Sequence, residues 1–334
     1  MKTAIISGIS GQDASYLAEL LLDKGYKVIG TSRRNAERTF SRIKDFKGRL
    51  EIVDVDLNES QAMEQLIRDT QADEFYNLAG QTFVADSFKN PFYTVQTNGL
   101  AVLNILEAIR RFSPQTKLYQ ASTSEMFGQV KEIPQTEGTP FNPSSPYGSA
   151  KLLAHNLCEI YRHSYGLFVC CGIFFNHESN RRGDEFVTKK ITNFVRKYED
   201  QLAFSSYDNI PLQLGNIYSK RDWGYAGDYV EAMWKMMQQK RPDTYVISTG
   251  ETHTVKEFVN EAFKNIGITL KWRGKGINEK AYDGKDIVVE ISKDFYRPFD
   301  VEFLLGNSKK AKNILKWKPK HDWKALCKIM IDGE

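Results

Sequence analysis

The sequence predicts an α/β fold, in which a doubly wound parallel sheet is joined by a smaller α/β domain. Short apolar runs alternate with helical patterns throughout the first half of the 334-residue chain, which is typical of a parallel sheet covered by helices. A glycine-rich turn directly follows the first apolar run. After about Asn176 the alternation gives way to polar loops and short helices, and the length suits about two domains.

The elements of the expected sheet follow in chain order. Strands are expected over residues 3–7, 26–30, 50–55, 74–78, 117–121 and 167–173. Helices are expected between them over 15–24, 59–70 and 91–111, with another after Pro146. The first helix ends at Gly25, a residue that favours helix C-termini. The second half predicts short helices near 187–199 and 228–240 and a Gly- and Lys-rich stretch over 274–285.

The two domains are expected to share the chain in interleaved pieces. We expect residues 1–172 and about 212–244 to form the larger domain, and about 173–211 and 245–334 to form the smaller one. The alternation of strand and helix patterns stops after residue 176, which indicates the first boundary.

Composition excludes several classes of protein. Hydrophobic residues make up 41% and charged residues 26% of the chain, close to a soluble globular average. The 46 Lys and Arg exceed the 42 Asp and Glu by four and are scattered, so no nucleic-acid partner is expected. No run approaches the roughly 20 apolar residues of a membrane span, and the first residues lack a signal-peptide layout. We therefore expect a cytoplasmic protein with no membrane partner.

The cysteines and histidines predict no metal site. The four cysteines form no CxxC pair, which fits a reducing compartment without a thiolate-bound metal. His177 has no partner His or Cys at ligand spacing, so a structural histidine is the simpler interpretation.

A glycine-rich turn predicts the cofactor site. Gly8, Gly11 and Ala14 form a GxxGxxA run between the first strand and the first helix. The glycines allow backbone N–H groups to approach a pyrophosphate at a helix N-terminus, and Ala14 is small enough for helix–strand packing. The run predicts the dinucleotide-binding turn of a Rossmann-like fold, and we assign Gln12 and Asp13, which lie within it, to the same site.

The end of the second strand favours NADP over NAD. An NAD-binding fold usually has an acidic residue there for the ribose hydroxyl, whereas this chain has Arg33 and Arg34. Two guanidinium groups suit a 2′-phosphate, although two solvated arginines are the alternative. Residues at the ends of the third and fourth strands are assigned to the same cofactor site on weaker signals: Asp56, Leu57, Leu78 and Ala79.

A YxxxK pair predicts a general base. Tyr147 and Lys151 are one helical turn apart, so both side chains can face one cleft. A nearby ammonium lowers the pKa of a phenol and lets the phenolate act on a sugar hydroxyl. Lys151 can also bind the nicotinamide ribose. The position of the pair between the fifth and sixth strands supports this interpretation.

Two further candidates follow the fifth strand. Thr123 offers a hydroxyl to the reacting oxygen, and Glu125 puts a carboxyl group beside it. A simple alcohol dehydrogenase needs no such acid, whereas elimination of water needs a group that first accepts and then donates a proton. A helix-capping or surface carboxylate is the alternative for Glu125.

At these residues the chain resembles the extended short-chain dehydrogenase/reductase superfamily, and within it the GDP-mannose 4,6-dehydratases. The matching segments read SGISGQDASYLAELLLDKGY, TSRR, YQASTSEMFG, SPYGSAK, FNHES, EFVTKKI, KRDWGYAGDYVEAMW and YRPFDVEFLLGN. They occur in order over nearly the whole chain, which is more specific than any one of them. The resemblance implies an NADP-binding Rossmann domain and a nucleotide-sugar-binding domain.

The resemblance also implies a reaction, that of a redox-neutral hydro-lyase. NADP would oxidise C4 of a GDP-sugar while Tyr147 takes the O4 proton, aided by Thr123 and Lys151. Glu125 would then remove the C5 proton and assist loss of the C6 hydroxyl as water. Reduction at C6 would yield a GDP-4-keto-6-deoxy sugar and regenerate NADP.

Other positions carry over from the family motifs. Those that would bind the substrate are Asn176, Lys189, Arg221, Arg297 and Glu302. Those in a loop that would reach a neighbouring subunit's cofactor are Arg34, Asn35 and Arg42. This loop implies a homotetramer, with a dimer as the alternative.

The chain departs from the family pattern in ways that leave the sugar open. Asn180 stands where the family has a Pro-led turn, and Tyr225 and Gly227 stand where it tends to have His and Lys. GDP-mannose and a GDP-manno-heptose are therefore both candidate substrates. A nucleotide-sugar 4-epimerase or C4 oxidoreductase would use the same Tyr/Lys pair but would need no C5 base. A non-catalytic NADP-binding regulatory protein would not need Glu125 and Tyr147 at all.

Overall fold

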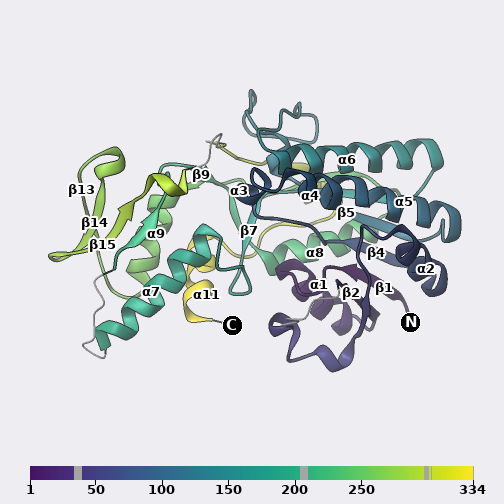
Figure 1. The fold of residues 1–334 in the computed structure, drawn as a ribbon, viewed down its shortest axis with the longest axis horizontal. Helices are drawn as coiled ribbons and strands as arrows, with labels where there is room; N and C mark the ends of the chain where they lie inside the picture. The colour runs from purple at the N-terminus through teal and green to yellow at the C-terminus, as the bar shows by residue number, and fades with distance from the viewer. Residues whose placement is uncertain (34–39, 204–209, 297–300, 302, 334) are drawn as a thin grey trace.

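The computed structural model describes residues 1–33, 40–203, 210–296, 301 and 303–333, and its larger sheet has seven parallel strands. In the order β11-β6-β5-β4-β1-β2-β3 they are Thr244–Ile247, Val169–Phe174, Lys117–Thr123, Glu74–Asn77, Thr3–Ser7, Lys27–Ser32 and Glu51–Asp54. Strand order reverses between β1 and β4, as in doubly wound sheets. The expected fold class is confirmed (Figure 1).

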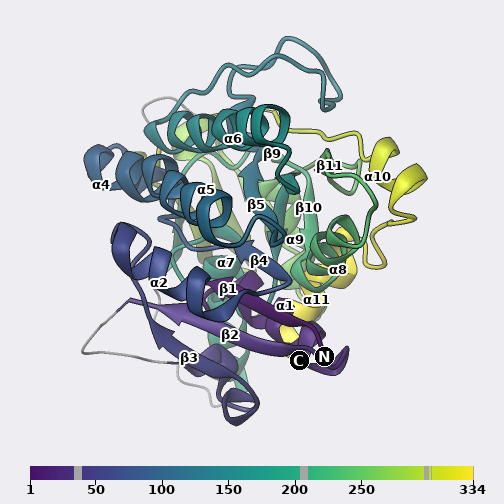
Figure 2. The same ribbon diagram turned by 90° about the vertical axis from the view of Figure 1, so that its right-hand side faces the viewer.

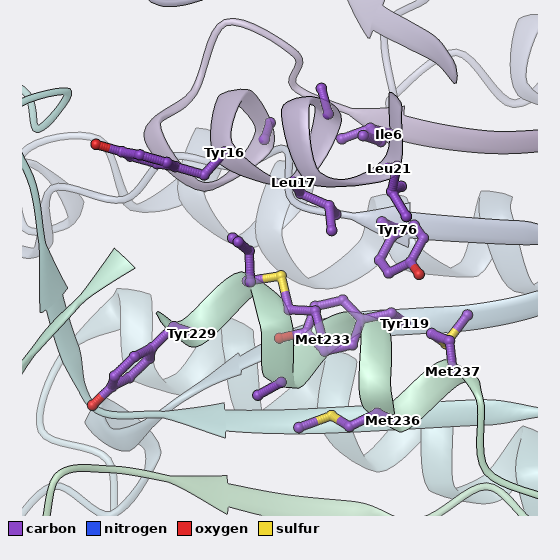
Figure 3. Close-up of a cluster of buried hydrophobic side chains, with 14 of the residues drawn as sticks. Ile6, Tyr16, Leu17, Leu21, Tyr76, Tyr119, Tyr229, Met233, Met236 and Met237 are labelled. Carbon is purple, nitrogen blue, oxygen red and sulfur yellow. The ribbon is translucent and has the colours of Figure 1, made fainter. Parts of the chain in front are cut away.

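Helices cover both faces of this sheet (Figure 2). One face carries α1 (Gln12–Asp23) and α8 (Ala226–Met237), and the other carries α2 (Ser60–Thr70), α5 (Ala101–Phe112) and α6 (Pro146–Tyr165). Neighbouring residues of β1 point to opposite faces, so Ile6 packs in the first cluster and Ile5 in the second. In the first cluster Leu17 of α1, Met233 of α8 and Tyr119 of β5 lie together (Figure 3).

The expected strands of the first half are all confirmed, but β11 was not expected. Its four residues are fully buried between a turn and a loop. A short apolar run of this length does not distinguish a strand from a loop or a helix segment. The helix expected over 91–111 is also confirmed, and it contains an unexpected π-helical turn, η3 (Gln96–Leu100), between α4 (Pro91–Val95) and α5.

The smaller domain has its own sheet and core. Its four strands, in the order β13-β14-β15-β8, are Lys271–Arg273, Lys280–Asp283, Asp286–Ile291 and Leu212–Leu214. The helices α7 (Val187–Ala203), α9 (Val255–Asn265) and α11 (Trp323–Asp332) pack on it. The helix expected near 187–199 is therefore confirmed, and the Gly- and Lys-rich stretch forms a β-hairpin.

Two expected boundaries need correction at the level of strands. Residues 212–214 were expected in the larger domain, but β8 pairs with β15 of the smaller sheet. Residues 245–247 were expected in the smaller domain, but β11 pairs with β6 of the larger sheet. Pairing between strands far apart in the chain decides both positions, and no local pattern encodes it. The division into two interleaved domains stays a prediction.

Short elements complete the described fold. Two strand pairs lie between the sheets: β7 (Asn176–Glu178) with β10 (Trp223–Tyr225), and β9 (Lys220–Arg221) with β12 (His253–Thr254). The short helices are η1 (Ser41–Ile43), η2 (Lys47–Arg49), α3 (Val84–Ser87), η4 (Ser124–Met126), η5 (Gly276–Asn278), η6 (Lys293–Phe295) and α10 (Lys309–Ile314). Within the described ranges, no helix combines the length and apolar character of a bilayer span.

Candidate active site

A cavity of about 820 Å³ lies at the carboxyl ends of β1 to β4, over the N-terminus of α1. Ligands of open α/β sheets bind at this edge. Most of the expected cofactor residues line it: Gly8, Gly11, Gln12, Asp13, Arg33, Asp56, Leu57, Leu78 and Ala79. The sequence motifs from four different strand ends therefore meet in one cavity.

The glycine-rich turn is held tightly against the end of β4. Gly8 has a positive φ of 71°, and a Cβ atom there would lie 2.8 Å from Cα of Ala79. The hydroxyl of Ser7 accepts hydrogen bonds from the backbone N–H groups of Leu78 and Ala79, each at 3.0 Å. Any larger residue at Gly8 would push the glycine-rich turn away from the end of β4, so this position requires glycine.

The far end of the cavity carries a fixed positive charge. Nη1 of Arg33 donates to the hydroxyl of Tyr93 at 2.5 Å, and both residues line the cavity. The Asp56 carboxylate accepts from the backbone N–H of Asn58 at 2.9 Å. Two of the expected residues, Arg34 and Asn35, lie outside the described residues.

Several cavity residues could not be predicted from the sequence, because they come from segments far from the cofactor motifs. Tyr93 belongs to α4 and Thr97 to the π-helical turn, and Arg182 follows β7. Nε of Arg182 lies 3.0 Å from the Glu178 carboxylate, and its guanidinium lies 3.5 Å from the centre of the Phe186 ring. The only available signal was the basic pair at residues 181–182, and nothing local showed that it folds over the cavity.

The four expected catalytic residues come together where β5 ends and α6 begins. None of them is among the residues that line the cavity, but the Lys151 ammonium lies near Gly80 of its wall. Thr123 ends β5, and its hydroxyl accepts a hydrogen bond from the backbone N–H of Glu125 at 3.2 Å. Tyr147 and Lys151 lie in the first turns of α6, which begins at the capping residue Ser145. A Cβ atom on Gly148 would lie 2.7 Å from the Glu125 carbonyl oxygen. Backbone contact between η4 and α6 thus brings the Glu125 and Tyr147 side chains close.

Burial controls the protonation of the Tyr147 and Lys151 side chains. It raises the pKa of Tyr147 to about 12, against a hydrogen bond with Thr123 that lowers it. Burial also lowers the pKa of Lys151 to about 8. The Lys151 ammonium donates to the Ala121 carbonyl at 3.0 Å and lies 5.9 Å from the Tyr147 ring centre. The pKa of Tyr147 is therefore raised in this arrangement and not lowered as expected, because desolvation outweighs the hydrogen bond with Thr123.

Glu125 is buried, and its carboxylate has no hydrogen-bond partner within the described residues. Only 8% of the residue is exposed. Its negative charge contributes to the raised pKa of Tyr147, so the two groups interact electrostatically. A surface carboxylate would be solvated, and a capping carboxylate would accept backbone N–H groups. Neither alternative describes Glu125.

The expected substrate residues lie around the strands between the two sheets. Asn176 begins β7, and its buried side-chain oxygen has no hydrogen-bond partner among the described residues. The Lys189 ammonium donates to the Asn180 carbonyl at 2.7 Å, and burial lowers the pKa of Lys189. Arg221 is buried in β9. Arg297 and Glu302 lie outside the described residues.

Arg42 makes its hydrogen bonds within this chain. Its guanidinium donates to the carbonyl of Ser10, in the glycine-rich turn, at 3.0 Å and to the carbonyl of Arg181 at 2.5 Å. It therefore joins the turn to the basic pair beyond β7. Its expected contact with a neighbouring subunit's cofactor stays a prediction.

Comparison with known proteins agrees with the motifs. The family model described as GDP-mannose 4,6 dehydratase matches residues 5–330. The GDP-mannose 4,6 dehydratase of Dictyostelium discoideum is 44% identical, with 99% of this chain and 95% of that protein covered. The human protein of the same name is 43% identical, with 99% and 91% covered. The structure of dTDP-glucose 4,6-dehydratase from Bacillus anthracis in complex with NAD shares the fold, with a TM-score of 0.80 at 21% identity, covering 99% of this chain and 96% of that one. Matches of this extent and identity mean that the chain belongs to the GDP-mannose 4,6 dehydratase family.

Proposed function

We propose that the protein is a hydro-lyase that converts GDP-mannose into the GDP-4-keto-6-deoxy sugar. The observation that carries the proposal is the buried, unpaired carboxylate of Glu125 beside Thr123 and Tyr147. Oxidation and reduction at C4 alone need a tyrosine and a lysine, whereas loss of water from C5 and C6 needs this additional acid and base. The names of the curated relatives support the same reaction.

We infer that the cofactor is NADP. The cavity fits a dinucleotide, because Gly8 allows close backbone approach at the N-terminus of α1 and Arg33 supplies a guanidinium at the end of β2. The end of β2, at residues 31–33, has no carboxylate to accept a hydrogen bond from a ribose hydroxyl. A bound NADP supplies a two-electron acceptor at C4 and returns the electrons at C6, so no net oxidation occurs.

Tyr147 accepts the O4 proton in the first step. Because its pKa is raised to about 12, the phenol must first lose its own proton, which the neutral form of the Lys151 amine can accept. Thr123 is placed to share a hydrogen bond with the same substrate oxygen. The Lys151 side chain, with a pKa of about 8, changes charge near neutral pH and is suited to proton exchange and to stabilising the phenolate.

Glu125 performs the elimination. Once C4 is a ketone, the C5–H bond is acidic, and the carboxylate takes this proton while the electron pair forms the C5–C6 double bond. The C6–O bond breaks, and the protonated Glu125 donates its proton to the departing hydroxyl, which leaves as water. Reduction at C6, and protonation at C5 with the proton that Tyr147 took from O4, complete the product and restore the phenolate. A single carboxyl group thus serves as base and then as acid.

The sugar we propose is mannose, the substrate in the names of the curated relatives, because two departures from the family pattern, Tyr225 and Gly227, have a packing explanation. The Tyr225 ring packs edge-on against Tyr16 and His321, with ring centres 5.8 and 4.8 Å apart. A Cβ atom on Gly227 would lie 2.5 Å from the Tyr225 ring. The small residue at 227 therefore accommodates the large ring at 225.

The test is incubation of the purified protein with NADP and either GDP-mannose or a GDP-manno-heptose, followed by mass spectrometry. Loss of one water from GDP-mannose, faster than from the heptose, is the expected result. A product of unchanged mass with inverted C4 would contradict the proposal and indicate an epimerase. Binding of NADP without any turnover would indicate a regulatory protein.

A further inference from the structure

The glycine-rich turn and β7 are joined by a cluster of buried polar contacts that the proposed reaction does not use. Nε2 of His177 lies 2.7 Å from the Asp13 carboxylate. The side chain of Gln12 donates to the His177 carbonyl at 3.2 Å and accepts from the Ser179 hydroxyl at 2.8 Å. Asp13 lines the cavity, and His177 follows Asn176. The cluster therefore connects the proposed cofactor turn with the proposed substrate strand.

The two neighbours of the imidazole determine its charge. Nδ1 lies 2.8 Å from the carbonyl oxygen of Phe175, which can only accept, so Nδ1 carries a hydrogen. Nε2 faces an acceptor too, namely the Asp13 carboxylate. Burial alone would lower the pKa of His177, but Asp13 and the Phe175 carbonyl together raise it. Burial would raise the pKa of Asp13, but His177 lowers it. Both shifts favour the imidazolium and carboxylate forms of the pair.

Among the residues that the structure describes, no second anion lies at hydrogen-bond distance from His177. The Tyr229 ring of α8 stacks on the imidazole with ring centres 4.8 Å apart, and the Phe174 ring meets it edge-on at 5.6 Å. Arg182 faces the pair and favours neutral His177 and charged Asp13. Asp13 is thus the anion that holds the proton on Nε2.

A carboxylate in a cavity for an anionic dinucleotide is unfavourable unless its charge is compensated. We infer that His177 is a positioning residue, whose imidazolium neutralises Asp13 and holds the glycine-rich turn against β7 for dinucleotide binding. The inference rests on the proposed cofactor. When His177 loses its Nε2 proton, two acceptors face each other, Asp13 keeps its full charge, and the turn loses its link to β7. Dinucleotide affinity therefore decreases as the pH rises through the titration of His177.

The experiment measures the dissociation constant of NADPH by calorimetry from about pH 6 to about pH 9, across the histidine range. The wild-type protein is expected to bind about tenfold more weakly at the alkaline end, which is within the usual range of coupling between sites. His177→Gln can still donate to Asp13 but has no charge, so it is expected to bind weakly at neutral pH and to show a smaller alkaline decrease than the wild type. Asp13→Asn is also expected to show a smaller decrease, because only the contribution of Lys151, with its pKa of about 8, remains in both variants.

His163→Gln is the matched control, because His163 is exposed at the end of α6. It is expected to keep the wild-type profile, and titration of the 2′-phosphate near pH 6 and of Lys151, with a pKa of about 8, is common to all variants. A flat wild-type profile, or a decrease in His177→Gln as large as that of the wild type, would overturn the inference. Absence of NADPH binding at every pH would instead overturn the proposed cofactor.

A second measurement does not depend on the variants folding. NMR of the five histidines, with isotope-labelled imidazole rings, reports which ring nitrogens are protonated in the wild-type protein. His177 is expected to be doubly protonated at neutral pH, when exposed histidines are mostly neutral. A neutral His177 ring at that pH would overturn the inference.

Discussion

The proposed reaction depends on the buried hydroxyl group of Tyr147, which takes the O4 proton. Tyr147→Phe keeps the buried ring and removes only the hydroxyl. We expect the turnover of GDP-mannose to fall by about 100- to 10,000-fold, the usual contribution of a general base, while NADP affinity changes little. Steady-state rates and calorimetry test this. Turnover within a few-fold of the wild type would show that another group takes the O4 proton.

Arg33 is expected to decide cofactor preference at the other end of the cavity. A guanidinium can form charge-assisted bonds to a 2′-phosphate that NAD lacks. Arg33→Ser should weaken NADP binding by about 10- to 100-fold, equivalent to the usual 1.5–3 kcal/mol of such bonds, and leave NAD binding unchanged. Arg49→Ser, at an exposed arginine of η2, is the control. Equal loss of both cofactors would argue against a 2′-phosphate site.

Single residues were predictable where chemistry is encoded by short spacing. The run from Gly8 to Ala14 and the Tyr147–Lys151 pair follow directly from motif and position. Tyr93 and Arg182 could not be found this way, because tertiary packing brings their segments to the cavity. The pKa of Tyr147 was also not predictable, because it depends mainly on burial, which no sequence motif encodes.

At the scale of elements, the turn between β1 and α1 is the most constrained part of the site. Gly8→Ala places a methyl group 2.8 Å from Cα of Ala79 and also strains a backbone with φ of 71°. Gly25→Ala shares only the strain, since its φ is 78° and nothing lies within 4 Å of the added atom. We expect Gly25→Ala to lower the free energy of unfolding by about 1–2 kcal/mol.

Gly8→Ala should destabilise the protein more than Gly25→Ala does, and it should also weaken NADP binding. Chemical denaturation and calorimetry measure the two effects separately. Equal stability of the two variants, with intact NADP affinity in Gly8→Ala, would show that the turn tolerates a wider spacing from β4.

Elements with long periodic patterns were predictable, and short ones were not. The helix over 91–111 was expected from its pattern, yet the π-helical turn within it was not, because no propensity marks the change. Strand β11 is four residues long, and its identity depends on pairing with β6. Strand β8 likewise depends on a partner almost eighty residues away, since Val289 pairs with Leu212.

At the scale of the whole molecule, the neighbouring helices α4, η3 and α6 expose apolar side chains. Phe92 is 91%, Leu100 49% and Ile160 52% exposed, and exposed apolar surface of sufficient extent marks interaction sites. We propose that copies of the chain associate through this face. Ile160→Glu should lower the mass measured by light scattering relative to the wild type, whereas Ile314→Glu on α10 should not. An unchanged mass for Ile160→Glu would contradict this.

In the proposed reaction, one chain oxidises the sugar and then eliminates water, and Glu125 is needed only for the elimination. The most direct measurement mixes Glu125→Gln with NADP and GDP-mannose and follows the near-ultraviolet absorbance of reduced cofactor together with the substrate mass. We expect reduced cofactor to accumulate and no water to be lost, whereas wild type and the exposed control Glu132→Gln dehydrate the sugar. Dehydration by Glu125→Gln at the wild-type rate would show that another group performs the elimination.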